Sequence, residues 1–347
     1  MNRAAIVYAL ASAALFGAST PLAKLLVGEM SPLVVAGLLY LGSGLGLLVW
    51  FLMRKTKERA ASLRKVDLPW LAGAIAAGGV AGPALLMYGL VFTDGATASL
   101  LLNLEGVFTA ALAWVVFREN VDRRVLLGMM AIVAGGAVLS SAEIPRAGGL
   151  AGPLLIAAAC LAWGIDNNLT RRVSGGDAVI IAGTKGLVAG AVNLTLGFMQ
   201  GAALPGPTLI ASAATLGLFG YGISLVLFVV ALRHLGTART SAYFSVAPFF
   251  GAALALLVLR DSPSAAFWIA AALMAAGVWL HVTERHEHEH VHEPLTHAHA
   301  HVHDEHHRHA HAFDLDGAEP HVHEHRHAPL KHSHPHYPDL HHRHEHD

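Results

Sequence analysis

Residues 97–119 read TASLLLNLEGVFTAALAWVVFRE. The stretch is apolar over about twenty residues, which is the length of helix that crosses the ~30 Å hydrocarbon core of a bilayer. Glu105 lies inside the apolar run. A carboxylate at membrane depth is costly unless it is paired or hydrated. The stretch therefore predicts a transmembrane helix with a functional or compensated charge.

A second stretch repeats this pattern 142 positions later: residues 240–261 read TSAYFSVAPFFGAALALLVLRD. The matched positions are Ser99 with Ser241, Gly106 with Pro248, Phe108 with Phe250, Arg118 with Arg260, Glu119 with Asp261 and, further along, Gly135 with Gly277. Helices rich in Ala and Leu can match by chance. The glycine and charge matches nevertheless favour an internal duplication of the kind that transporters carry.

The composition is that of a membrane protein. Of 347 residues, 54% are hydrophobic and 14% are charged, and the mean hydropathy is +0.50. These values exclude an ordinary soluble globular domain. The single cysteine, Cys160, rules out an intrachain disulfide.

Apolar runs of membrane-spanning length recur along the chain and predict an all-α polytopic fold with ten transmembrane helices. The first run has no cleavage site after it and is interpreted as a retained helix. Two of the runs meet near Asp94-Gly95 with almost no loop. The predicted spans are 4–27, 32–53, 70–93, 95–117, 124–141, 149–169, 178–199, 208–232, 237–259 and 264–283.

The distribution of Lys and Arg predicts the orientation. If the N-terminus is cytoplasmic, fifteen of these residues flank the spans on the cytoplasmic side, and three (Lys24, Arg146 and Arg260) lie on the other side. By the positive-inside rule both termini are then cytoplasmic, and we expect a multi-pass protein of the cell (inner) membrane. Five spans per half is an odd number, so the second half is predicted to be inverted relative to the first.

Residues 16–24, FGASTPLAK, together with the 97–119 stretch and its copy, resemble the drug/metabolite transporter superfamily, EamA type. The first copy reads Leu104-Glu105-Gly106 where this family often has proline, and the second reads Ala247-Pro248. The resemblance implies two inverted five-helix repeats, 1–142 and 143–285, around a central cavity. It also implies export of small metabolites or toxic compounds by alternating access.

Two ionisable residues inside the spans are the first candidates for that cavity. Glu105 and Lys185 lie at depths that differ by roughly 7 Å at 1.5 Å per residue, within reach of two long side chains. One interpretation makes them a buried pair. The alternatives are that Lys185 snorkels to the surface and that Asn103 or a backbone group caps Glu105.

Polar residues and prolines at repeated depths are further candidates. Asp166 and Asn167 close the sixth span, at the depth of the polar run in the first span. They line a vestibule in one interpretation and lie at the membrane interface in the other. Pro21 and Pro248 fall near corresponding depths in opposite halves. One interpretation makes them a shared hinge, and the other makes them two independent, harmless kinks.

The sequence carries no sign of nucleotide or covalent chemistry. The fragment Gly183-Thr184-Lys185-Gly186 lacks the preceding glycine and the following Ser or Thr of a phosphate-binding loop. No nucleophile, base and acid are arranged for catalysis. We therefore expect a gradient-driven transporter of a small molecule, with no enzymatic activity, no nucleic-acid partner and no required cofactor.

Residues 286–347 form a different kind of segment. They hold 23 of the 25 histidines, with acidic residues between them and little apolar content, which predicts a disordered tail. Neutral imidazole binds Zn, Ni, Co and Cu, and His-x-His spacing lets neighbouring rings converge on one ion. The candidate metal ligands are His286, His288, His290, His292, His297, His299, His301, His303, His321, His323, His325 and His327.

Three functions remain open at this point. The first is an exporter of a metabolite or drug-like compound with an incidental or regulatory tail. The second is a transporter of a divalent transition metal supplied by the tail. The third is a membrane-anchored metal buffer or sensor. The metal-transport function is disfavoured, because the spans lack the clustered ligands that a dehydrated cation requires.

Overall fold

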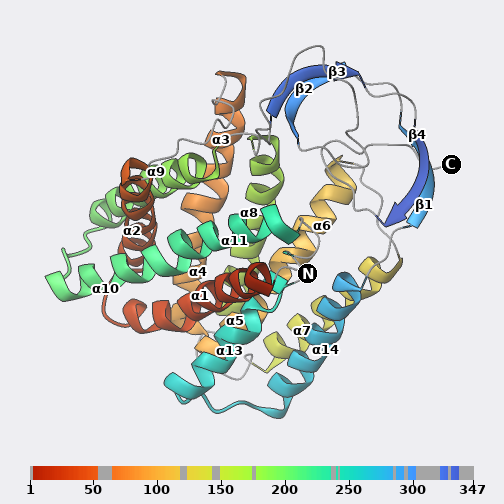
Figure 1. The fold of residues 1–347 in the computed structure, drawn as a ribbon. Helices are drawn as coiled ribbons and strands as arrows, with labels where there is room; N and C mark the ends of the chain where they lie inside the picture. The colour runs from red at the N-terminus through yellow and green to blue at the C-terminus, as the bar shows by residue number, and fades with distance from the viewer. Residues whose placement is uncertain are drawn as a thin grey trace. The chain divides into compact units, whose positions relative to one another are not determined.

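The computed structural model describes residues 3–53, 65–117, 123–142, 149–173, 177–235, 240, 243–283, 287–292, 296–301, 321–326 and 330–335. The chain divides into two compact units, Met1–Glu284 and Arg285–Asp347, and each is described by itself. The described part of the first unit is helical throughout, with short connections (Figure 1). The second contains only short strands among its described residues.

The helices of the first half follow the apolar runs. They are α1 (Arg3–Val27), α2 (Pro32–Met53), the short turn η1 (Lys65–Asp67), α3 (Leu68–Ala74), the π-helix η2 (Ile75–Ala81), α4 (Gly82–Phe92), α5 (Gly95–Leu101), α6 (Leu104–Phe117) and α7 (Arg123–Ser141). From η1 to α4 the chain is one uninterrupted helical stretch.

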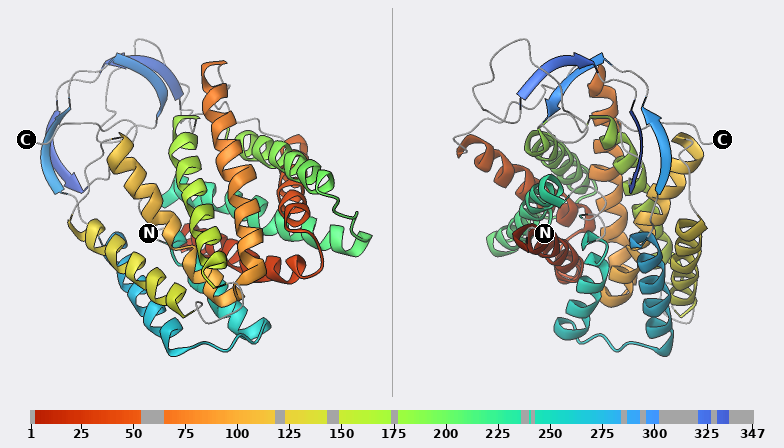
Figure 2. Two further views of the ribbon diagram at one scale, coloured as in Figure 1. Left: turned by 180° about the vertical axis from the view of Figure 1, so that it is seen from behind. Right: turned by 45° about the vertical axis from the view of Figure 1, so that its right-hand side comes forward.

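The described residues of the second half are also helical. Its helices are α8 (Ala151–Val173), α9 (Ala178–Met199), α10 (Pro207–Gly217), the π-helix η3 (Leu218–Ile223), α11 (Ser224–Leu235), α13 (Ala247–Val258) and α14 (Ala265–Val282). In both views of Figure 2, α7 and α14 run side by side, and the contacts between them are extensive.

Seven helical stretches in the described part of the chain are long and apolar enough to cross a membrane. Two further apolar helices, Ala247–Val258 and Ala265–His281, are shorter. The protein is thus a polytopic helical membrane protein. Most helix ends agree with the predicted spans within a few residues, including the close junction at Thr93 and Asp94 between α4 and α5. There the Asp94 carboxylate caps α5 by accepting a hydrogen bond from Thr97 N at 2.7 Å.

Two predicted helices are interrupted. The predicted 95–117 helix breaks at Leu102 and Asn103, between α5 and α6. The predicted 237–259 helix has a turn at Ser245 and Val246, so Pro248 lies in the first turn of α13. Proline fits this position because its missing N–H would have no helical partner there. The sequence predicted that Pro248 lies inside a continuous helix, but it lies at the beginning of one. Pro21 does lie inside α1.

Glycines allow the close helix crossings. A Cβ atom on Gly186 of α9 would lie 2.7 Å from the Gly44 backbone of α2. A Cβ atom on Gly277 of α14 would lie 2.6 Å from Ile132 of α7. Side chains larger than hydrogen would hold these helix pairs apart, and such small-residue contacts are how helices associate where no hydrophobic effect drives them together.

The tail unit contains two antiparallel strand pairs where the sequence predicted disorder. Strand β1 (Glu287–His292) pairs with β4 (Leu330–Pro335), and β2 (Thr296–His301) pairs with β3 (His321–Arg326). The alternation of histidine with other residues has the period of two that strands require, which accounts for the difference. Three of the candidate ligands, His286, His303 and His327, lie outside the described residues.

Candidate functional site

Glu105 is the central residue of the candidate site, and it is partly exposed just after the break before α6. It lies in the first turn of α6, directly after the turn at Leu102 and Asn103. The predicted cap from Asn103 does not form: Asn103 Nδ2 donates instead to Leu100 O at 2.9 Å and lies 3.8 Å from Met274 Sδ. Asn103 is buried in the turn between α5 and α6.

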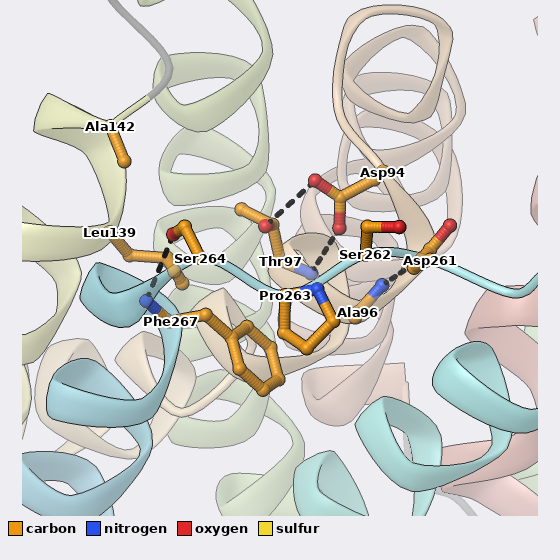
Figure 3. A pocket seen from close by; sticks show the side chains of 10 residues that line it. All are labelled: Asp94, Ala96, Thr97, Leu139, Ala142, Asp261, Ser262, Pro263, Ser264 and Phe267. Atoms are coloured by element: carbon orange, nitrogen blue, oxygen red, sulfur yellow. Dashed lines mark hydrogen bonds between the residues drawn. The ribbon is translucent and has the colours of Figure 1, made fainter.

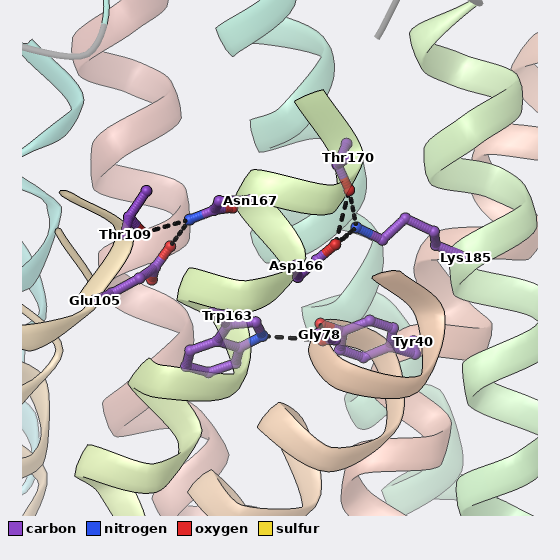
Figure 4. Close-up of polar contacts among 9 residues, drawn as sticks. All are labelled: Tyr40, Gly78, Glu105, Thr109, Trp163, Asp166, Asn167, Thr170 and Lys185. Atoms are coloured by element: carbon purple, nitrogen blue, oxygen red, sulfur yellow. Dashed lines mark hydrogen bonds and ion pairs between the residues drawn. The ribbon is translucent and has the colours of Figure 1, made fainter. Parts of the chain in front are cut away.

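The partner of Glu105 comes from α8 (Figure 4). Asn167 Nδ2 donates to Glu105 Oε1 at 2.9 Å and to Thr109 Oγ1 at 3.2 Å. Glu105 and Thr109 are four residues apart on α6, so they lie on one helix face and present two oxygens to the same amide. An amide satisfies hydrogen bonds but adds no positive charge.

Asp166, next to Asn167, binds Lys185. Lys185 Nζ donates to both Asp166 carboxylate oxygens, at 2.6 and 2.7 Å, and to Thr170 Oγ1 at 3.2 Å. Both side chains are mostly buried, with 17% of Lys185 and 9% of Asp166 exposed. In this structure Lys185 pairs with Asp166 and Glu105 with Asn167, so the interpretation of a Glu105–Lys185 pair is not realised here. Matching depth does not fix which way a helix face points. Lys185 of α9 meets α8 before it can reach α6.

The π-helix η2 fixes this part of α8. Tyr40 Oη and Trp163 Nε1 both donate to Gly78 O, at 2.8 and 2.9 Å, and Asn193 Nδ2 donates to Gly79 O at 3.1 Å. A Cβ atom on Gly78 would collide with the Asp166 side chain. The glycine therefore sets the position of the ion pair. Sequence reasoning missed Tyr40, Trp163 and Gly78, although the Gly78-Gly79 doublet inside an apolar span was a usable signal.

Aromatic rings adjoin these polar groups. Tyr221 of η3 lies with its ring centroid 5.5 Å from that of Tyr40 and 5.7 Å from that of Phe16. Phe244 continues the row, 5.4 Å from Phe16. Each of the four rings is partly exposed. Tyr40 and Tyr221 also lie within range of the Glu105 charge. The site thus combines one carboxylate with several ring faces.

Open space lies next to Glu105. A Cβ atom added to Gly106 would meet no atom within 4 Å. Gly106 and Asn167 are exposed, and Glu105 is partly exposed. The polar groups therefore border open space, in contrast to the closely packed glycines of the helix crossings described above.

A second polar cluster joins the two halves at the beginning of α5 (Figure 3). Asp261, which follows α13, accepts a hydrogen bond from Ala96 N at 2.9 Å. Burial raises the pKa of Asp261, the charge of Asp94 raises it further, and the hydrogen bond from Ala96 opposes the rise. Lys24 donates nearby to Leu90 O. This contact ties the second half of the chain to the first.

The described side chains do not form a metal centre. Among them, no three His, Cys, Asp or Glu residues cluster in a way that could hold a metal ion. The Asp166 carboxylate is already bound by Lys185.

Comparison with known proteins gives the family. The EamA-like transporter family matches residues 3–141 and again residues 150–283. The chain belongs to the EamA-like transporter family. A relative from Methanothermobacter thermautotrophicus, described as an uncharacterized transporter, is 28% identical over 284 residues, covering 76% of this chain and 82% of that protein.

A solved structure shares the EamA-like fold. A crystal structure that is described only as that of a protein superposes with a TM-score of 0.59 at 20% sequence identity. The match covers 81% of this chain and 96% of the other. At this identity the likeness concerns the fold alone, so the substrate of this EamA-like transporter must be argued from its own residues.

Proposed function

We propose that this EamA-like protein is a gradient-driven exporter of a small organic solute, with Glu105 at the centre of its transport site. One observation carries the proposal: a carboxylate midway along the Gly95–Val116 span, hydrogen-bonded to a neutral amide, beside the open space at Gly106. The free-energy cost of a charged carboxylate in that position falls when it binds a proton or a solute that compensates its charge. Either event couples occupancy to conformation.

The proposed architecture has ten spans in two inverted repeats. The seven long helices, α8, α13 with the residues before it, and α14 would supply the spans. Matched contacts support the duplication. A Cβ atom on Gly17 would lie 3.1 Å from Gly251 N, and one on Gly164 would lie 3.1 Å from Thr109 N. Gly251 follows Thr109 by the 142 positions of the sequence repeat.

Repeat symmetry suggests how access would alternate. With both termini in the cytoplasm, α5 would begin at the outer surface, where Asp261 bonds to Ala96. The described arrangement would then be held together at its outer end, with Glu105 reached from the cytoplasm. Export requires the outer contact to open and the equivalent contact in the other repeat to form.

A divalent metal is a poor fit to the described site. A dehydrated transition metal requires several converging nitrogen, sulfur or oxygen ligands. Glu105 offers one carboxylate beside an amide, and Asp166 is bound to Lys185. An organic solute needs only one charged anchor and a shaped apolar surface, which these residues supply.

The test is solute-driven proton flux in proteoliposomes that contain the purified full chain. Candidate solutes are added under an imposed pH gradient, and internal pH is followed with a trapped dye. Glu105→Gln should abolish the flux without loss of folded protein. Glu29→Gln, the same change at an exposed turn after α1, is the matched control and should leave the flux unchanged. Normal flux in Glu105→Gln would overturn the proposal.

A further inference from the structure

The charged side chains of the candidate site do not balance. They are Glu105, Asp166 and Lys185, and all three come from the predicted spans. Asp166 and Lys185 form a bidentate ion pair at 2.6 and 2.7 Å, so together they contribute no net charge. Glu105 is left with a neutral partner, Asn167. The site therefore has an excess of one negative charge when Glu105 is ionised.

An unbalanced carboxylate at this depth selects the charge of its ligand. Bringing an anion close to Glu105 adds repulsion in a medium of low polarity, whereas a cation compensates the charge that is already there. The preference does not depend on the rest of the ligand. It depends on Lys185 staying with Asp166, and Thr170 reinforces that pair by bonding to both partners.

The aromatic row indicates the remainder of the ligand. Tyr40, Tyr221, Phe16 and Phe244 form a row in that order, with adjacent ring centroids 5.4 to 5.7 Å apart, and each of these residues is partly exposed. Aromatic rings attract cations over their faces and pack against flat apolar groups. The rings come from α1, α2, η3 and the residues before α13, so both halves of the chain contribute to the surface.

We propose that the solute is an organic monocation with an aromatic or flat apolar body, its positive charge against Glu105 and its body against the rings of Phe16, Tyr40 and Tyr221. This inference rests on the proposed transport function and names the class of substrate. The open space beside Gly106 is where the charged end enters the site.

Protons compete with this cation. Glu105 can hold either a proton or the cation, so the carrier exchanges one for the other without net movement of charge. Ionisable groups near Glu105 on the surrounding elements are Asp166, Lys185, Tyr40, Tyr221 and Cys160. Lys185 and Asp166 are bound to each other, and the remaining three ionise only in alkaline solution. Cation binding should therefore weaken as the pH falls.

The test uses three phenyl compounds of similar size and permanent charge state. Phenyltrimethylammonium is the cation, methyl phenyl sulfone is neutral, and benzenesulfonate is the anion. Calorimetry on the purified full chain should show binding of the cation, weaker at lower pH, and much weaker binding of the other two. Glu105→Gln should weaken cation binding about tenfold or more and remove its pH dependence. Glu29→Gln should change neither.

A second variant guards against misfolding. Gly106→Leu fills space that is empty, so the protein should keep its helical circular dichroism while losing cation binding. Three results would overturn the inference: equal binding of the sulfone or the sulfonate, no binding of the cation by folded protein, or an unchanged affinity in Glu105→Gln. Cation binding without uptake into proteoliposomes would instead contradict the transport function and leave the charge-selective site standing.

Discussion

At the residue scale, the net charge of the site is determined by the partner that each charged side chain binds. Glu105, Asp166 and Lys185 were all identifiable from the sequence as ionisable groups in apolar runs. Their pairing was not, because hydropathy and spacing report depth and say nothing of the rotation of one helix against another. Asp166 and Asn167, adjacent on α8, face Lys185 and Glu105 respectively.

The ion pair should show strong coupling between its members. Lys185→Met leaves the Asp166 carboxylate buried and unpaired, and we expect a loss of stability on the order of 3 kcal/mol. Adding Asp166→Asn should restore much of that loss. Unfolding of the purified variants in mixed micelles measures the double-mutant cycle. Glu105→Gln combined with Lys185→Met should be additive, and strong coupling between those two would contradict the pairing described here.

Asp261 should give the outer contact a dependence on pH. Burial raises its pKa in the folded protein above the unfolded value. The folded state then binds the proton more tightly, so this group favours folding most at acid pH, below the unfolded value. That contribution is lost as the pH rises through the folded pKa. The melting temperature of wild type relative to Asp261→Asn should therefore fall from acid to neutral pH, and a rise would refute the assignment.

At the element scale, the departures from regular helix are what position the site. The break before α6 presents Glu105, and η2 presents Gly78 O to Tyr40 and Trp163. The second π-helix, η3, ends at Ile223, and η2 ends at Ala81, positions 142 apart as in the sequence repeat. A Cβ atom on Gly220 of η3 would lie 2.7 Å from Ser19 Cβ, much as Gly78 meets Asp166.

Sequence reasoning located the helices well and their irregularities poorly. Run length and apolarity predicted Pro32–Met53 and Ala178–Met199 almost to the residue. Apolarity does not distinguish i→i+4 from i→i+5 hydrogen bonding, so η2 and η3 read as ordinary helix. The same holds for the turn at Leu102, where apolar residues continue on both sides of the break.

Two glycines provide a matched test of the η2 contact. Gly78→Ala places a methyl group against Asp166, and we expect a loss of about 1–3 kcal/mol in stability together with slower transport. Gly106→Ala meets empty space within a helix and should be neutral or slightly stabilising, by up to about 1 kcal/mol. Unfolding and flux assays on both variants measure whether the close contact between Gly78 and Asp166 is needed. Equal effects would mean that Gly78 has no special role.

At the scale of the whole molecule, the proposed direction of transport depends on the predicted orientation. The Lys and Arg bias predicts that residues 57–65 are cytoplasmic and that the region of Arg146 is outside. A cysteine placed in 57–65 should therefore resist impermeant thiol reagents in intact cells and react after permeabilisation. A cysteine beside Arg146 should react in both conditions. The reverse pattern would invert the topology and the proposed direction.

The histidine-rich unit should bind metal without being needed for transport. Imidazoles are mostly neutral near pH 7 and can ligate Zn or Ni directly. We expect the full chain to bind several exchangeable ions that are lost as the pH falls through about 6.5. A chain ending at residue 285 should lose this binding and keep its solute flux. Metal flux that disappears with the tail would favour a metal carrier instead.

Cys160 makes the proposed conformational cycle testable by spectroscopy. It is the single cysteine of the chain, it is fully buried in α8, and its sulfur lies 3.7 Å from Leu101 O. A thiol in such apolar surroundings reacts poorly with labelling reagents. Nitroxide or fluorescent labels would therefore attach only where a cysteine is introduced, in an otherwise native chain. A label pair at the beginning of α5 and the end of α13 would then report directly how far apart the two halves move.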